Sequence, residues 1–367
     1  MTNKFRIIPC CLAFAVSCVA AVPTAELALT GTVERYIAID NVCAWPNLTM
    51  MPDGRITAAI FNRPSHGEEE GSLEVWGSPD GRFWEKRGVA APHDPQTNRM
   101  HVAIGLAKNG DLLAIVSGFT NIQQTGRPKQ PPFRDKVIPA WVCRSSDGGR
   151  TWTQHKAFTP AFPGWNTFVP YGEITLGGDG ALHATCYTRK LDSNPGVQHV
   201  WHFRSDDDGR TWRPTSIIGT NHNETDLFHL GGLKWLAAAR TLDTRTLDLF
   251  RSNDDGATWE GPQRVTENQQ MPADLERLSD GRLLMSYGTR IEGGFGVLAK
   301  LSHDEGRTWS APIRLADSLH WDCGYPSSVQ RPDGRVVTAY YSKSAQNHNR
   351  YHMGVVIWNP PAPGQEK

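Results

Sequence analysis

One short pattern recurs along this chain and limits its fold more than any other feature. It reads Ser-x-Asp-x-Gly-x-Thr-Trp and occupies residues 145–152, 205–212, 252–259 and 302–309, with a shortened copy at 78–84. In such a pattern Asp accepts backbone N–H bonds, Gly supplies a backbone angle that other residues avoid, and Trp packs beneath the turn. We interpret each copy, called an Asp box below, as a structural turn. A calcium loop would carry a denser set of acidic ligands.

A second series of turns alternates with the Asp boxes. It consists of Asp53-Gly54, Asn109-Gly110, Asp179-Gly180, Gly231-Gly232, Asp280-Gly281 and Asp333-Gly334. Each lies between two short apolar runs, which is typical of a β-hairpin whose turn needs positive φ. A unit with one turn of each kind holds two hairpins, or four strands in about 50 to 55 residues. The sequence therefore predicts an all-β fold, a six-bladed β-propeller of four-stranded antiparallel blades with Asp-box turns.

Composition agrees with a single globular domain. The 38 basic and 38 acidic residues cancel to a formal charge of zero, which argues against a nucleic-acid partner because phosphate binding requires a basic surface. The 35 Gly and 25 Pro leave little room for long helices. We expect residues 26–367 to form one propeller, with residues 119–140 as a long loop inside the second unit.

The N-terminal segment has the pattern of a targeting signal. Lys4 and Arg6 precede an apolar run over residues 7–22 that ends in small side chains. This pattern predicts a signal peptide over residues 1–25 and hence a secreted or periplasmic protein without a membrane span after cleavage. The alternatives are a short anchor helix and a lipoprotein acylated at Cys18.

Cysteine spacing suggests a covalent closure of the fold. Removal of the signal peptide leaves four of the seven Cys, namely Cys43, Cys143, Cys186 and Cys323. Cys43 and Cys323 each lie eleven residues before a turn glycine, in the first and last units, which become neighbours when a ring closes. We therefore predict a disulfide between them, with two buried thiols as the alternative.

The turn register predicts which side chains meet at the centre. Residues at similar distances before and after a turn lie at the same end of the inner strand pair. Eight or nine residues after the turn glycines stand Arg63, Arg189, Arg240, Arg290 and Lys343, and only the second unit has an uncharged residue, Phe119. The preceding strands carry Trp45, His101, Tyr171, Glu173, Glu224, Asp274 and Tyr325 at the matching level. Such a ring suits an anionic, oxygen-rich ligand, although salt bridges between blades are the alternative.

Two segments resemble the sialidase superfamily of bacterial neuraminidase repeat proteins. In the first, Glu224 is followed by Arg240 and then by an Asp box. In the second, Arg290 precedes an Asp box and the segment Gly-Tyr-Pro-Ser-Ser, which contains Tyr325. The resemblance covers the chain after the signal peptide and is most specific over residues 223–342.

The resemblance implies a retaining glycosidase with Tyr325 as nucleophile and Glu224 as its activating base. A neutral phenol avoids the repulsion that a carboxylate nucleophile would meet from an acidic sugar. An acid/base carboxylate is expected from the loop inside the first unit, where Glu68, Glu69 and Glu70 are consecutive. Among these we favour Glu70.

The resemblance also implies a set of arginines that bind the sugar carboxylate. Arg240 and Arg290 match two of the family's three arginines, whereas the usual Arg-Ile-Pro motif is replaced here by Ala44-Trp45-Pro46. Arg63 or Arg99 would supply the missing charge. His66 and Asp274 complete the expected substrate-binding residues.

The sequence thus favours a glycoside hydrolase of the exo-α-sialidase type that releases a terminal acidic sugar, sialic acid first, from a glycan or oligosaccharide. One alternative is another glycan-active enzyme, either a different glycosidase or a polysaccharide lyase that uses Tyr325 with His66 or His101. Another is a non-catalytic glycan-binding propeller. No cofactor or metal is expected, because no His or Cys pair has ligand spacing. The sequence carries no signal for an oligomeric state.

Overall fold

The computed structural model describes residues 26–365 except 28, 30, 123–131, 135, 157–167 and 190–196. The predicted signal peptide lies outside the described residues. All regular elements in the described part of the chain are β-strands. Within that part, no helix is long and apolar enough to cross a membrane.

The strands fall into groups of four along the chain. These are β2 (Asn47–Met50), β3 (Ile56–Phe61), β4 (Leu73–Ser78) and β5 (Glu85–Ala91); β6 (His101–Leu106), β7 (Leu112–Thr120), β8 (Lys136–Ser145) and β9 (Thr153–His155); β10 (Val169–Leu176), β11 (Leu182–Arg189), β12 (Gln198–Ser205) and β13 (Arg213–Thr220); β14 (His222–Gly231), β15 (Lys234–Thr241), β16 (Leu247–Ser252) and β17 (Glu260–Arg264); β18 (Gln270–Arg277), β19 (Leu283–Thr289), β20 (Gly296–Ser302) and β21 (Ile313–Asp317); and β22 (Cys323–Gln330), β23 (Val336–Ser342) and β24 (His352–Trp358) with β1 (Glu34–Asp40).

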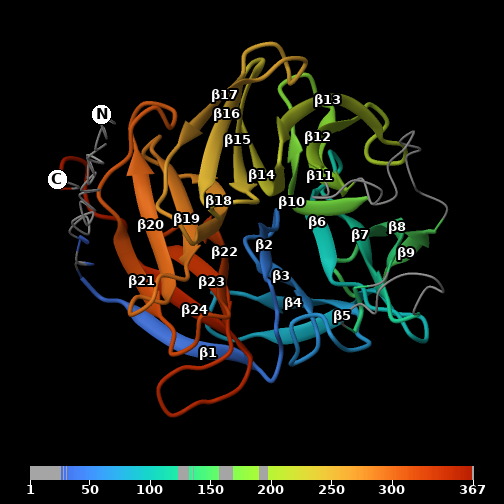
Figure 1. The fold of residues 1–367 in the computed structure, drawn as a ribbon, viewed down its shortest axis with the longest axis horizontal. Helices are drawn as coiled ribbons and strands as arrows, with labels where there is room; N and C mark the ends of the chain where they lie inside the picture. The colour runs from blue at the N-terminus through green and yellow to red at the C-terminus, as the bar shows by residue number, and fades with distance from the viewer. Residues whose placement is uncertain are drawn as a thin grey trace, which may run out of the picture.

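Within each group neighbouring strands pair in antiparallel fashion. Strands β6 and β10 also pair in parallel, which joins two groups into an eight-stranded sheet. The last group is completed by the first strand of the chain, because β1 pairs with β24. Figure 1 shows the first strand of each of the other groups near the middle of the molecule and the fourth strand at the rim. The chain thus has a β-propeller-type fold built from four-stranded antiparallel sheets, as predicted.

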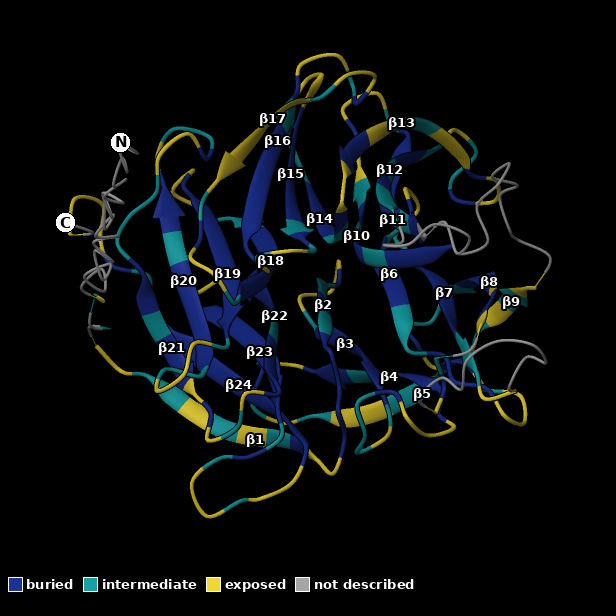
Figure 2. Ribbon diagram, in the orientation of Figure 1, coloured by how far each residue is buried: buried dark blue, intermediate teal, exposed yellow. Residues whose placement is uncertain are grey.

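The burial pattern follows from this packing. Every residue of β3, β19 and β24 is buried, whereas every residue of β17 at the rim is exposed. Figure 2 shows the same gradient from buried middle strands to exposed outer strands and loops. A strand covered on both faces reads as a continuous apolar run, which is why the alternation typical of half-exposed strands is weak in this sequence.

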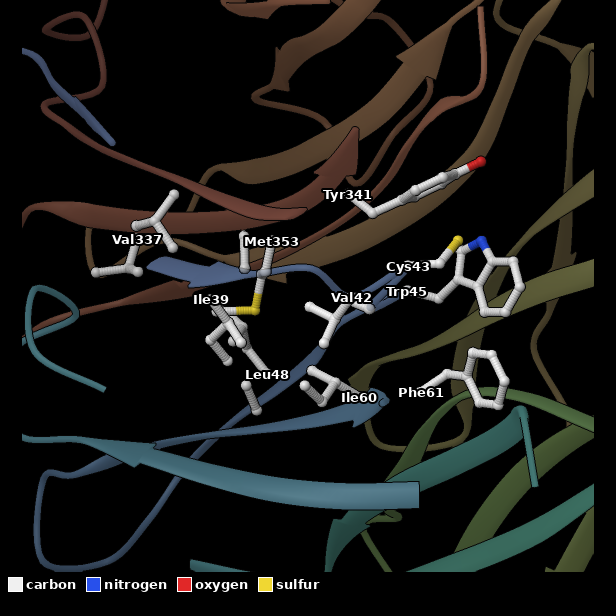
Figure 3. Packing of buried hydrophobic residues seen from close by; sticks show 14 of the residues in the cluster. Ile39, Val42, Cys43, Trp45, Leu48, Ile60, Phe61, Val337, Tyr341 and Met353 are labelled. Atoms are coloured by element: carbon white, nitrogen blue, oxygen red, sulfur yellow. The ribbon is translucent and has the colours of Figure 1, made fainter. Parts of the chain in front are cut away.

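A buried cluster joins the first sheet to the last. Leu48 and Ile60 of the first sheet pack with Ile39, Val337 and Met353 of the last. Figure 3 shows these side chains interlocked between the two sheets, with Trp45 and Tyr341 at one end of the cluster. Apolar burial therefore reinforces the hydrogen bonds between β1 and β24, and the first and last sheets are held together without a covalent link.

The predicted disulfide between Cys43 and Cys323 is wrong. Both residues are buried free thiols. Cys43 belongs to the cluster between the first and last sheets, whereas the Cys323 thiol faces the preceding sheet and donates to the Thr289 carbonyl oxygen at 3.8 Å. Burial raises the pKa of Cys323 to about 11. Equal spacing from a turn predicts the level of a residue in the ring, but it does not predict which side of the sheet the side chain faces.

The Asp boxes are folded turns, as predicted. In the box at 145–152, Asp147 accepts hydrogen bonds from the backbone N of Arg150 and Thr151, both at 2.9 Å, and from the Thr151 hydroxyl at 2.6 Å. Trp152 donates its indole N–H to the Gly149 carbonyl at 3.0 Å. Gly149 has φ of 89°, which a side chain would oppose.

Both series of turns lie on the same face of the molecule. The Lys108 backbone N, beside the Asn109-Gly110 turn, donates to Asp208 of an Asp box at 2.7 Å. Arg204 likewise forms ion pairs with Asp179 of a turn and Asp255 of an Asp box. These contacts place both series on one face, which leaves the other ends of the inner strands for a site.

We expect Asp147→Ala to lower the free energy of unfolding by roughly 1 to 3 kcal/mol, because the backbone N–H groups of the turn lose their acceptor. Chemical denaturation of the variant measures this. Asp317→Ala is the control, because the Asp317 side chain is 80% exposed and lies outside the Asp boxes. An unchanged unfolding free energy for Asp147→Ala would contradict a structural role.

Candidate active site

A cavity of about 290 Å³ lies at the ends of the inner strands, and no residue of an Asp box lines it. Six of the seven side chains predicted on the preceding strands line its wall, namely Trp45, His101, Tyr171, Glu224, Asp274 and Tyr325. The seventh, Glu173, lines a different cavity that also contacts the Asn109-Gly110 turn. The register argument therefore predicted the level of six of these side chains and was wrong for Glu173.

Tyr325 and Glu224 form a hydrogen-bonded pair in this cavity. The Tyr325 hydroxyl donates to Glu224 Oε1 at 2.6 Å. Arg240 Nη1 donates to Glu224 Oε2 and, at 3.1 Å, to the Tyr325 hydroxyl oxygen. The three side chains come from β22, β14 and β15, so a contact between two sheets assembles the group.

The backbone at Tyr325 has a sparsely populated conformation. Its φ is 49°, and Trp45, which also precedes a proline and lines the cavity, has φ of 45°. Gly324 allows this turn, since a Cβ there would lie 2.9 Å from the Gly288 Cα. Positive φ in a bulky residue costs on the order of 1–3 kcal/mol and persists only when the surrounding structure imposes it. Both aromatic rings are therefore held in place by the backbone as well as by packing.

The electrostatic environment keeps the Tyr325 proton in place. Burial and the negative charge of Glu224 raise the pKa of Tyr325 well above its ordinary value, although Arg240 and Arg290 act in the opposite direction. The phenol is consequently neutral at physiological pH. Any reaction in which Tyr325 acts as a nucleophile must pass its proton to Glu224, the carboxylate to which it is bonded.

Arg290 is positioned beside this pair by contacts with the last sheet. Its Nε donates to the Cys323 carbonyl at 3.1 Å, and its Nη2 donates to the Tyr341 hydroxyl at 2.8 Å. Its guanidinium carbon lies 5.7 Å from the centre of the Tyr325 ring. Arg240 and Arg290, the two arginines with the strongest sequence support, therefore line the same cavity.

Sequence reasoning missed a third arginine, Arg134. Its Nη2 donates to the His66 carbonyl at 2.6 Å, its Nη1 donates to the Gly67 carbonyl at 3.1 Å, and both Arg134 and His66 line the cavity. The guanidinium lies 5.1 Å from the centre of the Phe119 ring. Arg134 thus supplies a positive charge in the one unit whose inner strand carries Phe119 instead of a cation. Arg134 belongs to the loop predicted over residues 119–140. The repeat sets no register for residues of a loop, so it could not predict where the Arg134 side chain lies.

Three predicted residues lie outside the cavity wall. Glu70 is exposed, and its carboxylate accepts the Gln96 backbone N at 2.8 Å. Arg63 is also exposed and donates to the Glu70 carbonyl at 2.7 Å. Arg99 is buried elsewhere, with its guanidinium carbon 3.5 Å from the centre of the Trp141 ring. The structure therefore does not bring these three to the Tyr325–Glu224 pair.

Several buried polar atoms of the cavity residues have no hydrogen-bond partner in the described part of the chain. They are Trp45 Nε1, Asn223 Oδ1 and Arg240 Nε. Buried polar atoms are otherwise almost always satisfied, so a polar ligand would complete these groups. The cavity offers donors of both neutral and cationic character beside an aromatic wall.

Asp226 and Asp274 line the cavity, and a third carboxyl group, Glu276, lines the cavity that also contains Glu173. Asp274, predicted to bind substrate, accepts the Ser328 backbone N at 2.9 Å, and Asp226 accepts the Leu275 backbone N at 2.8 Å. Burial is the main cause that raises the pKa of Asp226 to about 6 and that of Glu276 to about 7, and it raises the pKa of Asp274 well above its ordinary value. Each of these carboxyl groups therefore keeps its proton to a higher pH than an exposed carboxyl group does.

The raised pKa of Glu276 makes stability depend on pH. A carboxyl with a folded pKa above its unfolded value contributes stability that is present below about pH 4.5 and is lost as pH rises through about 7. We expect Glu276→Gln to remove roughly 1 to 3 kcal/mol of this decline in unfolding free energy. Urea denaturation across this pH range measures it, with Glu292→Gln at an exposed position as the control. If the unfolding free energies of wild type and Glu276→Gln fall equally as pH rises, the raised pKa of Glu276 is contradicted.

The opposite face holds a group that the sequence did not suggest. Among the described residues, ligand atoms of Asp179, His183 and Asp255 lie within 4.8 Å of one another, close enough for a metal ion. Arg204 forms ion pairs with both carboxylates. The arginine therefore already supplies the positive charge that a metal ion would bring.

Comparison with known proteins identifies the family of this chain. Residues 54–338 match the model of the BNR repeat-like domain family, and this span contains Glu224, Arg240, Arg290 and Tyr325. The chain belongs to this family, within the sialidase superfamily. A curated relative of this BNR repeat protein is a sialidase from Micromonospora viridifaciens, which is 26% identical over 231 residues, or 56% of this chain and 35% of the relative. The chain thus spans about a third of the length of that relative.

Two solved structures share the fold of this BNR repeat protein. A protein of unknown function from Dyadobacter fermentans has a TM-score of 0.77 and 22% identity, covering 90% of this chain and 99% of its own. The Hadza microbial sialidase Hz136 has a TM-score of 0.71 and 18% identity, covering 89% of this chain and 68% of its own. At these identities the comparison establishes a common architecture.

Proposed function

We propose that this protein is a secreted, retaining glycoside hydrolase of the sialidase type that releases a terminal acidic sugar, sialic acid first, from glycans. The observation that carries this proposal is the 2.6 Å hydrogen bond from Tyr325 to Glu224 in a cavity that also contains Arg240 and Arg290. In this proposal residues 1–25 are a signal peptide, and the four-stranded groups of residues 26–367 are the blades of one six-bladed propeller.

The proposed reaction uses Tyr325 as the nucleophile. Its oxygen attacks the anomeric carbon while its proton passes to Glu224, and water later releases the sugar with its configuration retained. The neutral phenol meets no repulsion from a carboxylate on that carbon. Arg240, which contacts both Tyr325 and Glu224, would stabilise the negative charge that moves between them.

The proposed substrate is acidic because the cavity is rich in cations. Arg240, Arg290 and Arg134 all line it. Among the described residues, Nη1 of Arg290 has no hydrogen-bond partner, while Nε and Nη2 fix the orientation of the guanidinium. A fixed guanidinium with a free donor suits a sugar carboxylate. In this proposal Arg134 takes the place of the arginine that is missing before Pro46.

We expect Tyr325→Phe to lower turnover of a sialoside by several powers of ten with the fold intact, because the variant has no nucleophilic oxygen. Glu224→Gln should have a similar effect. The double variant should be no slower than either single variant, because base and nucleophile act as one unit. Near wild-type turnover by Tyr325→Phe would remove this mechanism.

We expect Arg290→Lys to lower kcat/KM by roughly 10- to 100-fold, mainly through KM, because lysine lacks the planar fork that holds a carboxylate. Steady-state kinetics on the same sialoside measures this. Arg63→Lys is the matched control, since Arg63 is exposed and does not line the cavity. Equal losses in the two variants would argue against a specific clamp at Arg290.

A polysaccharide lyase is the second candidate, and it is favoured by the presence of His66 and Tyr325 in one cavity. A lyase acting on a uronate would produce an unsaturated sugar with ultraviolet absorbance, whereas a hydrolase would release a reducing sugar without it. A screen against sialosides, uronides and deoxy-sugar glycosides distinguishes the two. A non-catalytic glycan-binding propeller would turn over none of them.

A further inference from the structure

His66 lies in the link between β3 and β4, and its ring lines the cavity. Its Nδ1 is 2.9 Å from Oδ1 of Asp322, which directly precedes β22. The ring meets Trp45 edge-on, with centroids 5.0 Å apart and planes at 88°. Contacts from the first and last sheets therefore fix the orientation of this imidazole.

The surroundings of Asp322 stabilise its ionised form. Its side chain is only 4% exposed, and its carboxylate accepts hydrogen bonds from the hydroxyls of Tyr341 and Tyr351 as well as from His66. Burial alone would raise the pKa of Asp322, but these hydrogen bonds hold it well below its ordinary range. The His66 Nδ1 is consequently the donor in their hydrogen bond, and Nε2 is left to exchange a proton.

The main chain around His66 is also held. Arg134 donates to the His66 carbonyl at 2.6 Å, and the Asn98 side chain donates to the Gly67 carbonyl at 2.8 Å. The His66 side chain is 35% exposed, and its Nε2 has no hydrogen-bond partner in the described part of the chain. A positioned imidazole with one tethered and one accessible nitrogen is suited to proton transfer.

No carboxylate from the same link lines the cavity. Glu68, Glu69 and Glu70 are all exposed, and Glu70 is bonded to the Gln96 backbone. The other carboxyl groups of the wall have different partners. Glu224 is bonded to Tyr325, while the buried Asp226 and Asp274 accept backbone N–H groups. His66 is therefore the remaining proton carrier of the cavity wall that belongs to the link where an acid/base residue was expected.

We propose that His66, oriented by Asp322, is the acid/base residue of this site. The inference rests on the hydrolase proposed above. In the first step protonated His66 gives its Nε2 proton to the glycosidic oxygen as the C–O bond breaks, while the Tyr325 oxygen bonds to the anomeric carbon and its proton passes to Glu224. In the second step neutral Nε2 takes a proton from water, the water oxygen bonds to the anomeric carbon, and Tyr325 leaves and regains its proton from Glu224.

An acid is needed most when the leaving group is poor. The test therefore compares 4-methylumbelliferyl sialoside, which has a good leaving group, with sialyllactose, which has a poor one. For His66→Gln we expect kcat/KM on sialyllactose to fall on the order of 10²- to 10⁴-fold and that on the aryl sialoside to change much less. Asp322→Asn should lower kcat/KM in the same pattern, with a larger loss on sialyllactose than on the aryl sialoside, but by a smaller factor than His66→Gln.

Two further measurements separate this role from a structural one. Added azide should restore aryl-sialoside turnover by His66→Ala, because azide attacks the sugar without a base and forms a glycosyl azide. Unfolding curves establish that each variant is folded. Glu70→Gln is the matched control and should behave as wild type on both substrates, because its side chain lies outside the cavity.

The outcomes distinguish the two proposals. If His66→Gln lowers kcat/KM by the same factor on both substrates, His66 is not the acid/base residue, although the hydrolase proposal stands. The same conclusion follows if Glu70→Gln is the variant that loses more kcat/KM on sialyllactose than on the aryl sialoside. If wild type cleaves neither sialoside while remaining folded, the sialidase proposal fails and the assignment of His66 fails with it.

Discussion

The pairing of β1 with β24 is the constraint on which the rest of this structure depends. It makes the first strand of the chain the outer strand of the last sheet, and the cluster of Ile39, Leu48, Ile60, Val337 and Met353 packs this seam. Because the seam is closed, Trp45 and His66 of the first unit face Tyr325 and Asp322 of the last. Residues of the first and last units therefore both contribute to the cavity wall.

Within the site, opposite charges lie close enough to offset the cost of burying each one. Glu224, Tyr325 and Arg240 share hydrogen bonds in a setting where each charge alone would be costly to bury. A second network links Arg290 through Tyr341 to Asp322 and hence to His66. The two networks meet at one cavity, so the orientation of the cationic residues and the orientation of the imidazole depend on shared side chains. This coupling is how a rigid scaffold positions several chemical groups at once.

Much of the site was predictable because a propeller repeats its geometry. A residue's distance from its turn sets its level on the inner strand, and this argument placed Tyr325, Glu224, Arg240 and Arg290 around one centre. It failed for Glu173 of β10, which lines a different cavity, and it could not place residues in the loops. Arg63 and Glu70 border a loop whose path the repeat does not determine, and Arg134 comes from a loop of the second unit. In each case the deciding contact was with a neighbouring unit or with loop backbone, which spacing does not encode.

The sequence by itself determined the all-β character and the turn chemistry of the Asp boxes, because these depend on local hydrogen bonds and on turn residues that recur along the chain. Tertiary structure decided the rest. It left Cys43 and Cys323 as separate thiols, turned Arg99 onto Trp141, and brought His66 to Asp322 across 256 residues of chain. Such contacts depend on side-chain direction where two sheets meet, which is set only when the sheets pack and both partners are buried together.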